Sequence, residues 1–251
     1  MRSTQLKTSW SLRRWQNHLD ELYGGVNKKR EPLETYARLT EMAAGTARGV
    51  REKDEELIQK YMPRFLSWLL GLSNQLNIDL EQSTFDYYPG VCTYCRQSYN
   101  CACKITKDEE HRIHDEEEIQ NLQRDHEKPS NLDDWVGMFN KIYGEVNESV
   151  GKEDLLFHLL EELGEVCEII RHYTISNENL EEWSEEVTSE DVEVRLKQEL
   201  SDLFAWYCGI SNILGVQIDH RMKMTYEETC PQCNQNPCEC NPYRVHRKIR
   251  L

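Results

Sequence analysis

Two short acidic motifs in the second half of the chain contain the residues best suited to chemistry. Glu161 and Glu162 precede Glu165 by four and three residues, so a helix presents the three side chains as neighbours along one edge. Glu199 and Asp202 are three residues apart, one predicted helix later. Carboxylates brought together repel one another strongly unless a cation lies between them. Oxygen ligands of this kind are typical of Mg²⁺ or Mn²⁺ sites.

A solvated acidic face is the alternative interpretation, because the chain has 45 acidic residues. Two features favour a metal site. Each motif is embedded in large apolar residues, such as Leu159 and Leu163 in the first and Leu200 and Phe204 in the second, so its acids lie close to a predicted core. The motifs also fall in consecutive predicted helices, in the order that a helical hairpin needs. The residues alone leave both interpretations open.

The first half of the chain repeats the surroundings of these motifs. One constant offset aligns residues 64–95 with 202–233, and a second offset aligns 12–27 with 132–147. At the five acidic positions the first copy has a different set, which is Glu41, Met42, Gly45, Tyr61 and Arg64. One scaffold is therefore used twice, and only the second copy keeps a set of charges that can hold a cation.

Apolar residues recur with helical rather than strand periodicity, so the sequence predicts an all-α fold of two tandem helical repeats. The helices expected in the second copy are Leu132–Asn147, Glu153–Tyr173, Glu190–Leu214 and Gln217–Glu228. Those expected in the first copy are Ser11–Asn27, Glu31–Arg51, Asp54–Leu76 and Asp79–Tyr87. An acidic loop is expected at Thr174–Ser189.

Eight of the ten cysteines form two clusters with one pattern, C-x-x-C followed by C-x-C. They are Cys92, Cys95, Cys101 and Cys103, then Cys230, Cys233, Cys238 and Cys240. Four thiolates within a dozen residues can close a tetrahedron around Zn²⁺, so we predict one structural zinc in each cluster. Disulfides are one alternative, and a partner-binding knuckle is another. Few basic or aromatic residues surround the clusters, which favours a structural clip.

The clusters and offsets predict a division of the chain into five parts. These are a first repeat at 1–103 with its knuckle at 92–103, a charged linker at 104–130 that is a helix or a tether, a second repeat at 131–240 with its knuckle at 230–240, and a basic tail at 241–251. We expect the tail to contact the protein's own acidic surface or a phosphate-bearing partner.

The charge of the chain restricts its partners. The formal net charge is −15. Residues 1–107 carry 16 basic and 12 acidic side chains, whereas residues 108–251 carry 14 and 33. Such an acidic chain is a poor general ligand for nucleic acid, whose phosphates are bound by Lys and Arg. No apolar run approaches the ~20 residues that span a membrane, and residues 1–17 lack the apolar core of a signal peptide. We therefore expect a cytoplasmic protein without membrane or nucleic-acid partners.

The order of the motifs resembles that of the all-α nucleoside triphosphate pyrophosphatases of the MazG type. The segments that carry the resemblance are Glu161-Glu162-Leu-Gly-Glu165-Val, Glu199-Leu-Ser-Asp202-Leu-Phe204 and Ser211-Asn-Ile-Leu214-Gly215-Val. The resemblance covers most of 132–228 and, in weaker form, 12–87. It departs in one place, because 33 residues separate Glu165 from Glu199, against 15 between Gly45 and Tyr61. The excess is the acidic loop, which affects substrate choice more than chemistry.

The resemblance implies an activity and a set of site residues. The activity is Mg²⁺-dependent hydrolysis of an NTP or dNTP between the α and β phosphates, giving a nucleoside monophosphate and pyrophosphate. The implied metal ligands are Glu162, Glu165, Glu199 and Asp202, with Glu161 as a further ligand or as the base that orients the attacking water. Family members assemble as dimers or larger oligomers with sites at the subunit interface. A tandem repeat would form that dimer within one chain, as a pseudo-dimeric four-helix-bundle core, and such pseudo-dimers would pair further as a homo-oligomer.

The first copy is then expected to complete the pocket of the second. Arg64 is a candidate for a phosphate contact, together with Arg38 or Arg48, and Asn212 of the second copy is a further candidate for substrate binding. Alternatively, Arg64 balances neighbouring acids. The alternative function is a nucleotide-sensing or assembly subunit without catalysis, which the loss of the acids in the first copy favours. A zinc-knuckle RNA adaptor is a third possibility, and the net charge argues against it.

Overall fold

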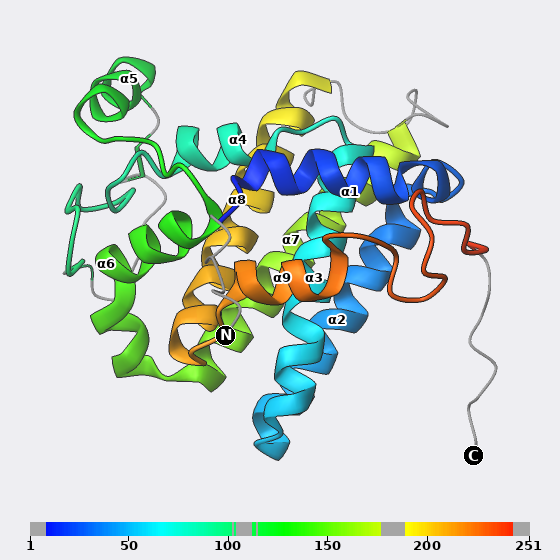
Figure 1. Cartoon of the computed structure of the whole chain (residues 1–251). Coiled ribbons are helices and arrows are strands. Elements are labelled where there is room, and N and C mark those ends of the chain that lie inside the picture. The colour runs from blue at the N-terminus through cyan, green and yellow to red at the C-terminus, as the bar shows by residue number, and fades with distance from the viewer. Residues whose placement is uncertain (1–8, 102, 104–111, 114, 177–188, 243–251) are drawn as a thin grey trace.

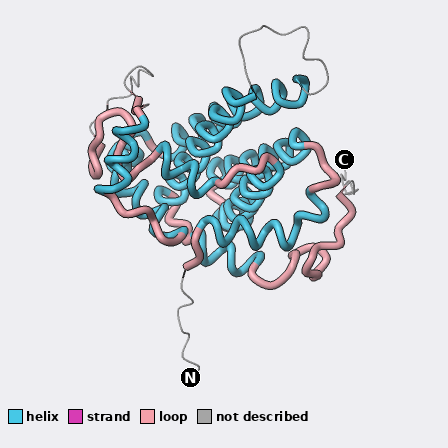
Figure 2. The backbone as a smooth tube through the Cα atoms, turned by 90° about the horizontal axis from the view of Figure 1, so that it is seen from above, coloured by secondary structure: helices cyan, strands magenta, loops and turns pink. Residues whose placement is uncertain are grey.

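Helices are the only regular secondary structure in the described part of the chain. The computed structural model describes residues 9–101, 103, 112–113, 115–176 and 189–242, which form helices and loops without a strand (Figures 1 and 2). This confirms the all-α prediction, and the predicted helix ends lie within three residues of the observed ones. The helices are α1 (Leu12–Asn27), α2 (Pro32–Glu52), α3 (Glu55–Gln75), α4 (Leu80–Tyr87), α5 (Glu116–Asp125), α6 (Leu132–Val150), α7 (Lys152–Ser176), α8 (Ser189–Ile213) and α9 (Ile218–Tyr226).

Side-chain caps explain why the helices begin where they do. The side chain of Asn131 accepts a hydrogen bond from the backbone N–H of Asp134 at the start of α6. Ser11, Asp54 and Asp79 cap α1, α3 and α4 in the same way. Each cap provides an acceptor for a backbone donor that has no partner within its helix. The sequence alone therefore fixes these four starts.

The two copies exchange their short last helices. Each long third helix packs against the first two helices of its own copy, α3 against α1 and α2, and α8 against α6 and α7. The short helix that follows crosses to the other copy, so that α4 packs on α8 and α9 packs on α3 (Figure 1). Helices α2 and α7 also pack together. The short helix after each long third helix thus packs on the long third helix of the other half of the chain.

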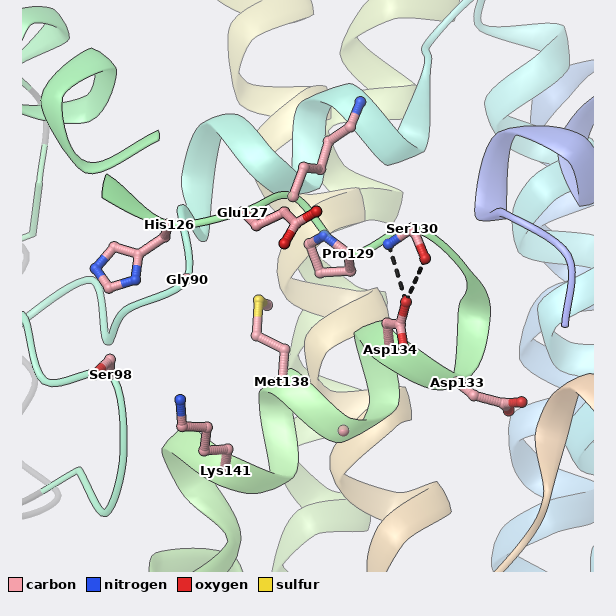
Figure 3. Close-up of a pocket in the computed structure, with 12 residues that line it drawn as sticks. Gly90, Ser98, His126, Glu127, Pro129, Ser130, Asp133, Asp134, Met138 and Lys141 are labelled. Atoms are coloured by element: carbon pink, nitrogen blue, oxygen red, sulfur yellow. Dashed lines mark hydrogen bonds between the residues drawn. The ribbon is translucent and has the colours of Figure 1, made fainter. Parts of the chain in front are cut away.

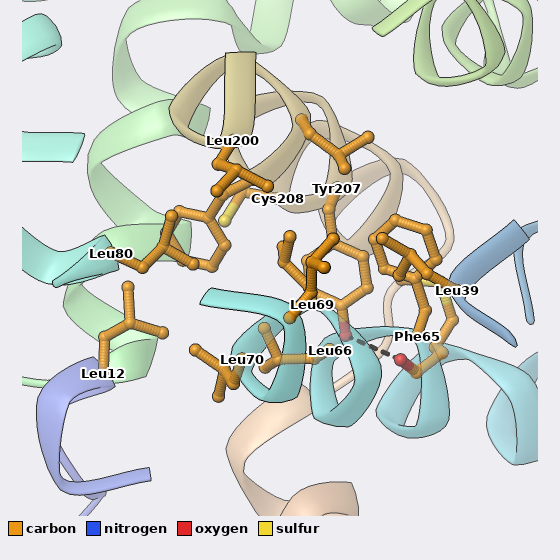
Figure 4. Close-up of a cluster of buried hydrophobic side chains, with 14 of the residues drawn as sticks. Leu12, Leu39, Phe65, Leu66, Leu69, Leu70, Leu80, Leu200, Tyr207 and Cys208 are labelled. Carbon is orange, nitrogen blue, oxygen red and sulfur yellow. Dashed lines mark hydrogen bonds between the residues drawn. The ribbon is translucent and has the colours of Figure 1, made fainter. Parts of the chain in front are cut away.

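One hydrophobic core contains residues of both copies. Figure 4 shows Leu12, Leu39 and Phe65 of the first copy in the same cluster as Leu200 and Tyr207 of α8. The rings of Phe65 and Tyr207 stack with their centroids 5.2 Å apart. The Tyr207 hydroxyl donates a hydrogen bond to the carbonyl oxygen of Met62, 3.0 Å away. Because burial of apolar surface is the main stabilising term in folding, the copies stabilise each other. The predicted boundaries between them stay predictions.

Three predicted segments fall partly outside the described residues. The linker 104–130 contains α5, so its described part includes a helix. Residues 174–176 of the expected acidic loop belong to α7 instead, and Ser189 belongs to α8. The rest of that loop, 177–188, and the tail residues 243–251 lie outside the described part of the chain. None of the described helices has the length and apolar character needed to cross a membrane.

Candidate active site

Three of the five predicted carboxylates meet between α7 and α8. One carboxylate oxygen each from Glu162, Glu165 and Glu199 lies within 4.8 Å of the other two. Glu162 and Glu165 lie one turn apart on α7, and Glu199 comes from α8, which packs against it. We call this group the glutamate cluster. Helix spacing brings the first two together, and the pairing of the helices adds the third.

Burial makes the charged form of the cluster costly. Burial, a hydrogen bond with Glu165 and the charge of Asp202 raise the pKa of Glu199 to about 9. Burial and the charges of Asp202 and Glu165 raise the pKa of Glu162 to about 8. Glu162 and Glu199 therefore favour the neutral form unless a cation compensates their charge. The electrostatics of the cluster therefore favour binding of a positive ion.

Glu162 also has an oxygen without a partner. Its Oε1 accepts a hydrogen bond from Trp206 Nε1 at 2.9 Å. Its Oε2 is buried and has no hydrogen-bond partner among the described residues. Buried polar atoms normally have a partner, so this oxygen is a position for a ligand. An all-oxygen donor set fits Mg²⁺ or Mn²⁺. The residues present thus fit the metal that the MazG resemblance implies.

Asp202 lies outside the glutamate cluster and is held by two residues that the sequence analysis missed. Arg112 Nη1 and Nη2 donate to its two oxygens, at 2.9 and 2.7 Å. The hydroxyl of Tyr88 donates to Oδ1. The side chains of Arg112 and Asp202 are only 4% and 9% exposed, so this ion pair is buried. The positive charge that compensates Asp202 is therefore the guanidinium of Arg112.

Glu161 is connected to the cluster through two aromatic rings. Its side chain is 68% exposed, and Oε2 lies 3.0 Å from Nδ1 of His158. The His158 ring stacks on Trp206, with centroids 4.4 Å apart. Trp206 in turn donates to Glu162. Glu161 thus lies at the solvent side of the site, oriented by a histidine rather than by the other acids.

The three residues predicted to contact substrate have other contacts. Arg38 forms an ion pair with Glu41 at 2.8 Å. Asn212 donates to the carbonyl of Val136 at 2.9 Å and so joins α8 to α6. It lies thirteen residues beyond Glu199, or about 20 Å along the helix. Arg64 lies close to Tyr226, whose pKa is raised to about 12 by burial against the opposing effect of that guanidinium.

The equivalent site of the first copy is closed by packing. Gly45 and Tyr61 occupy the positions that correspond to Glu165 and Glu199. A Cβ atom added to Gly45 would lie 2.4 to 2.6 Å from three ring atoms of Tyr61. The aromatic ring therefore rests directly on the glycine backbone. The ring of Tyr61 therefore fills the space beside Gly45, and no space for a cation is left between the two residues.

The cysteines form the two clusters that the sequence predicts. In each cluster the four Sγ atoms lie within 4.8 Å of one another. The backbone N–H of Cys103 points at the Sγ of Cys101, and that of Cys240 at the Sγ of Cys238, both at 3.4 Å. Such donors favour a thiolate, against burial, which raises the pKa of both Cys101 and Cys238. Backbone hydrogen bonds, first that of Glu239, lower the pKa of Cys233 to about 6. The donor set fits Zn²⁺.

A separate groove does not belong to this site. It has a volume of about 600 Å³ and lies between α6 and the segment that follows α5 (Figure 3). Residues such as His126, Met138 and Lys141 line it, and none of the predicted site residues does. The glutamate cluster lies elsewhere, between α7 and α8.

Comparison with known protein families agrees with the geometry. The model of the MazG nucleotide pyrophosphohydrolase domain matches residues 150–231, which include α7, α8 and α9 with both acidic motifs. No curated protein and no solved structure matched the chain. The match covers the copy that keeps the acids and excludes the copy in which Tyr61 packs on Gly45. Residues 150–231 are therefore similar to the MazG nucleotide pyrophosphohydrolase domain.

Proposed function

We propose that this protein is an Mg²⁺-dependent nucleotide pyrophosphohydrolase. Its substrate is an NTP or dNTP, cleaved between the α and β phosphates to a nucleoside monophosphate and pyrophosphate. The observation that carries the proposal is the glutamate cluster, with the partnerless Oε2 of Glu162, inside the region that matches the family. Further pairing of these pseudo-dimers into a homo-oligomer stays a prediction.

In this proposal Glu162, Glu165 and Glu199 hold the metal, and Asp202 does not take part while Arg112 binds it. Mg²⁺ at the cluster would supply the positive charge that neutralises the triphosphate and stabilises the pyrophosphate leaving group. Trp206 Nε1 orients Glu162 by fixing Oε1, which leaves Oε2 for the metal. The three glutamates supply enough negative charge to hold a divalent ion without Asp202.

Glu161 is proposed to be the base. The oxygen of a water molecule forms a bond to the α phosphorus, the bond from that phosphorus to the bridging oxygen breaks, and pyrophosphate leaves. Glu161 accepts the proton of the water on its carboxylate, while His158 holds Oε2 in place. A general base must lie within hydrogen-bond reach of the proton that it removes. The exposed position of Glu161 beside the cluster is compatible with an incoming solvent molecule.

We also propose that each cysteine cluster holds one Zn²⁺, so that the chain binds two. The proposal rests on the four converging Sγ atoms of each cluster and on the N–H groups that point at Cys101 and Cys238. Zn²⁺ bound by four thiolates has no open position for substrate, so these sites are structural.

The test is an assay with a panel of NTPs and dNTPs in Mg²⁺, with pyrophosphate and orthophosphate measured separately. We expect pyrophosphate from the wild type and a loss of at least 100-fold, or about 2.7 kcal/mol in barrier height, in Glu165→Gln and Glu199→Gln. Glu148→Gln is the matched control, because Glu148 is exposed on α6. Orthophosphate as the product, or full activity in both cluster variants, would contradict the proposal.

A nucleotide-binding subunit without turnover is the second candidate, and one observation favours it. The family resemblance implies that Asp202 is a metal ligand, but its carboxylate is bound by Arg112 of the same chain. This candidate predicts nucleotide binding that requires Mg²⁺ and the three glutamates, with no product formed. Equilibrium binding of a non-hydrolysable NTP analogue, measured beside the product assay, separates the two candidates.

A further inference from the structure

The two cysteine clusters make equivalent hydrogen bonds to opposite copies. In the first cluster the N–H of Cys101 donates to the carbonyl of Ile142 on α6, at 2.7 Å. In the second cluster the N–H of Cys238 donates to the carbonyl of Leu22 on α1, at 2.8 Å. Leu22 and Ile142 correspond under the offset that aligns α1 with α6. The same bond is therefore made twice, each time from one copy to the other.

Side chains surround each of these bonds. Beside the first cluster, the N–H of Asn100 donates to the carbonyl of Lys141 at 3.0 Å, and its Nδ2 donates to Glu145 Oε1 at 2.6 Å. Ile142 is buried in a small hydrophobic cluster with Cys92 and Cys101. Beside the second cluster, Arg30 Nη2 donates to the carbonyl of Pro242 at 3.1 Å. Each cluster thus rests on the first helix of the other copy, or just beyond its end.

The clusters come directly after the helices that are exchanged between the copies. Helix α4 leads into the first cluster and α9 into the second, and each has fewer than ten residues. Helices this short are not stable alone in water. Their buried residues pack on the other copy, and the cysteine segments after them extend that contact. Without an internal link, four thiols over a dozen residues would supply little of the order that this requires.

We propose that the two Zn²⁺ ions act as clamps between the copies. Each ion joins the C-x-x-C turn after a swapped helix to the C-x-C segment whose first N–H bonds the opposite copy. Zinc in the second cluster therefore stabilises α1 of the first copy, and zinc in the first cluster stabilises α6 of the second. The inference rests on the proposed zinc sites and is independent of the proposed hydrolase activity.

The first clamp also reaches the active site. The carbonyl of Thr93, which lies inside the first cluster, accepts a hydrogen bond from the N–H of Ile113 at 3.0 Å. The residue before Ile113 is Arg112, which binds Asp202. Tyr88, at the end of α4, binds the same carboxylate. The first zinc thus orders both partners of Asp202.

The experiment combines zinc analysis with hydrogen–deuterium exchange on the full chain. We expect two zinc ions in the wild type, and one each in Cys101→Ser and Cys238→Ser. Exchange should rise at least tenfold in α6 for Cys101→Ser, and in the C-terminal half of α1 for Cys238→Ser, with the opposite helix unchanged. Cys167→Ser, a substitution on α7 outside both clusters, should keep both ions and the wild-type exchange pattern.

The outcomes separate the two levels of the inference. Zinc content near zero in the wild type would overturn the zinc sites and the clamps together. If the wild type binds two ions, but exchange in each variant rises only within the cluster that lost its ion, the clamps are overturned and the zinc sites stand. If a variant does not fold, the same exchange experiment is done on wild type after zinc removal by a chelator. Added Zn²⁺ must then restore protection in both α1 and α6, and failure to do so contradicts the clamps.

Discussion

Arg112 and Asp202 form a buried, bidentate ion pair directly beside the glutamate cluster. Both Nη atoms bind the carboxylate, and Tyr88 donates a third hydrogen bond. Arg112 also lowers the pKa of Glu162, against the larger effect of burial. The segment between the two copies thus places a fixed positive charge where the family resemblance implies a metal ligand. Two predictions depend on this ion pair.

Removing Arg112 should destabilise the protein strongly. In Arg112→Ala the buried carboxylate of Asp202 loses its compensating charge, and breaking a buried pair in this way costs about 3–5 kcal/mol. Mg²⁺ should restore part of this loss, because a freed Asp202 becomes available to a cation. The free energy of unfolding is measured by denaturant titration with and without Mg²⁺. Arg48→Ala is the control, since its pair with Glu52 is exposed and screened by solvent. Equal losses in both variants contradict the prediction.

Magnesium affinity should depend on the three glutamates and not on Asp202. Glu162→Gln, Glu165→Gln and Glu199→Gln should each weaken Mg²⁺ binding at least tenfold, or about 1.4 kcal/mol. The double variant Arg112→Leu with Asp202→Leu removes both charges of the ion pair, and replacing a whole buried pair by apolar residues is often neutral for stability. It should bind Mg²⁺ within about threefold of wild type, which is under 1 kcal/mol. Calorimetric titration gives these affinities. A large loss in the double variant would make Asp202 a ligand after all.

The sequence predicted the helices and the convergence of the acids for physical reasons that are local. Caps such as Asn131 fix helix starts, and spacing fixes which acids of α7 share an edge. The sequence could not predict that Arg112 binds Asp202, because Arg112 lies in a charged segment without periodicity. Its approach to α8 depends on the bond between Ile113 and Thr93, which are distant from Asp202 in the sequence.

The exchange of α4 and α9 was also beyond the sequence. An apolar face indicates that a helix is buried, but the copies have similar faces, so the pattern does not tell which copy covers it. The contact between Gly45 and Tyr61 was missed for a related reason. Taken alone, Gly45 and Tyr61 each indicate only that an acid is absent. The packing of α2 on α3 shows that the ring of Tyr61 fills the space beside Gly45.

Without Mg²⁺, the stability of the protein should fall as the pH rises. The pKa values of Glu162 and Glu199 are raised to about 8 and about 9, from 4.5. Between these limits the folded state binds more protons than the unfolded state, so the free energy of unfolding decreases with pH. The stabilising contribution is complete below pH 4.5 and is lost as the pH passes 8 to 9.

Glu199→Gln isolates this effect, because a glutamine resembles a protonated glutamate. The variant should be about as stable as wild type at pH 6 and more stable at pH 9 in Mg²⁺-free buffer. Denaturant titrations at the two pH values provide the comparison, and saturating Mg²⁺ should reverse the order at pH 9. Parallel pH profiles for the two proteins would show that Glu199 does not carry the raised pKa.

The closed site of the first copy makes a prediction about stability that needs no ligand. Gly45→Ala puts a Cβ atom against the ring of Tyr61, and overpacking of this kind costs typically about 1–3 kcal/mol. Gly25→Ala is the matched control. Gly25 is also helical, a Cβ there meets nothing within 4 Å, and alanine should stabilise it by roughly 0.5–1 kcal/mol.

A double-mutant cycle then tests whether the ring is the cause. If Tyr61 fills the position that Glu199 has in the second copy, Gly45→Ala should become stabilising in a Tyr61→Ala background, as Gly25→Ala is in the wild type. Coupling of at least about 1 kcal/mol is expected for residues in contact, from free energies of unfolding of the four proteins. Additive effects would contradict the packing of the Tyr61 ring on Gly45. Coupling would mean that the two residues form a packed pair, which stabilises the contact between α2 and α3 without a cation.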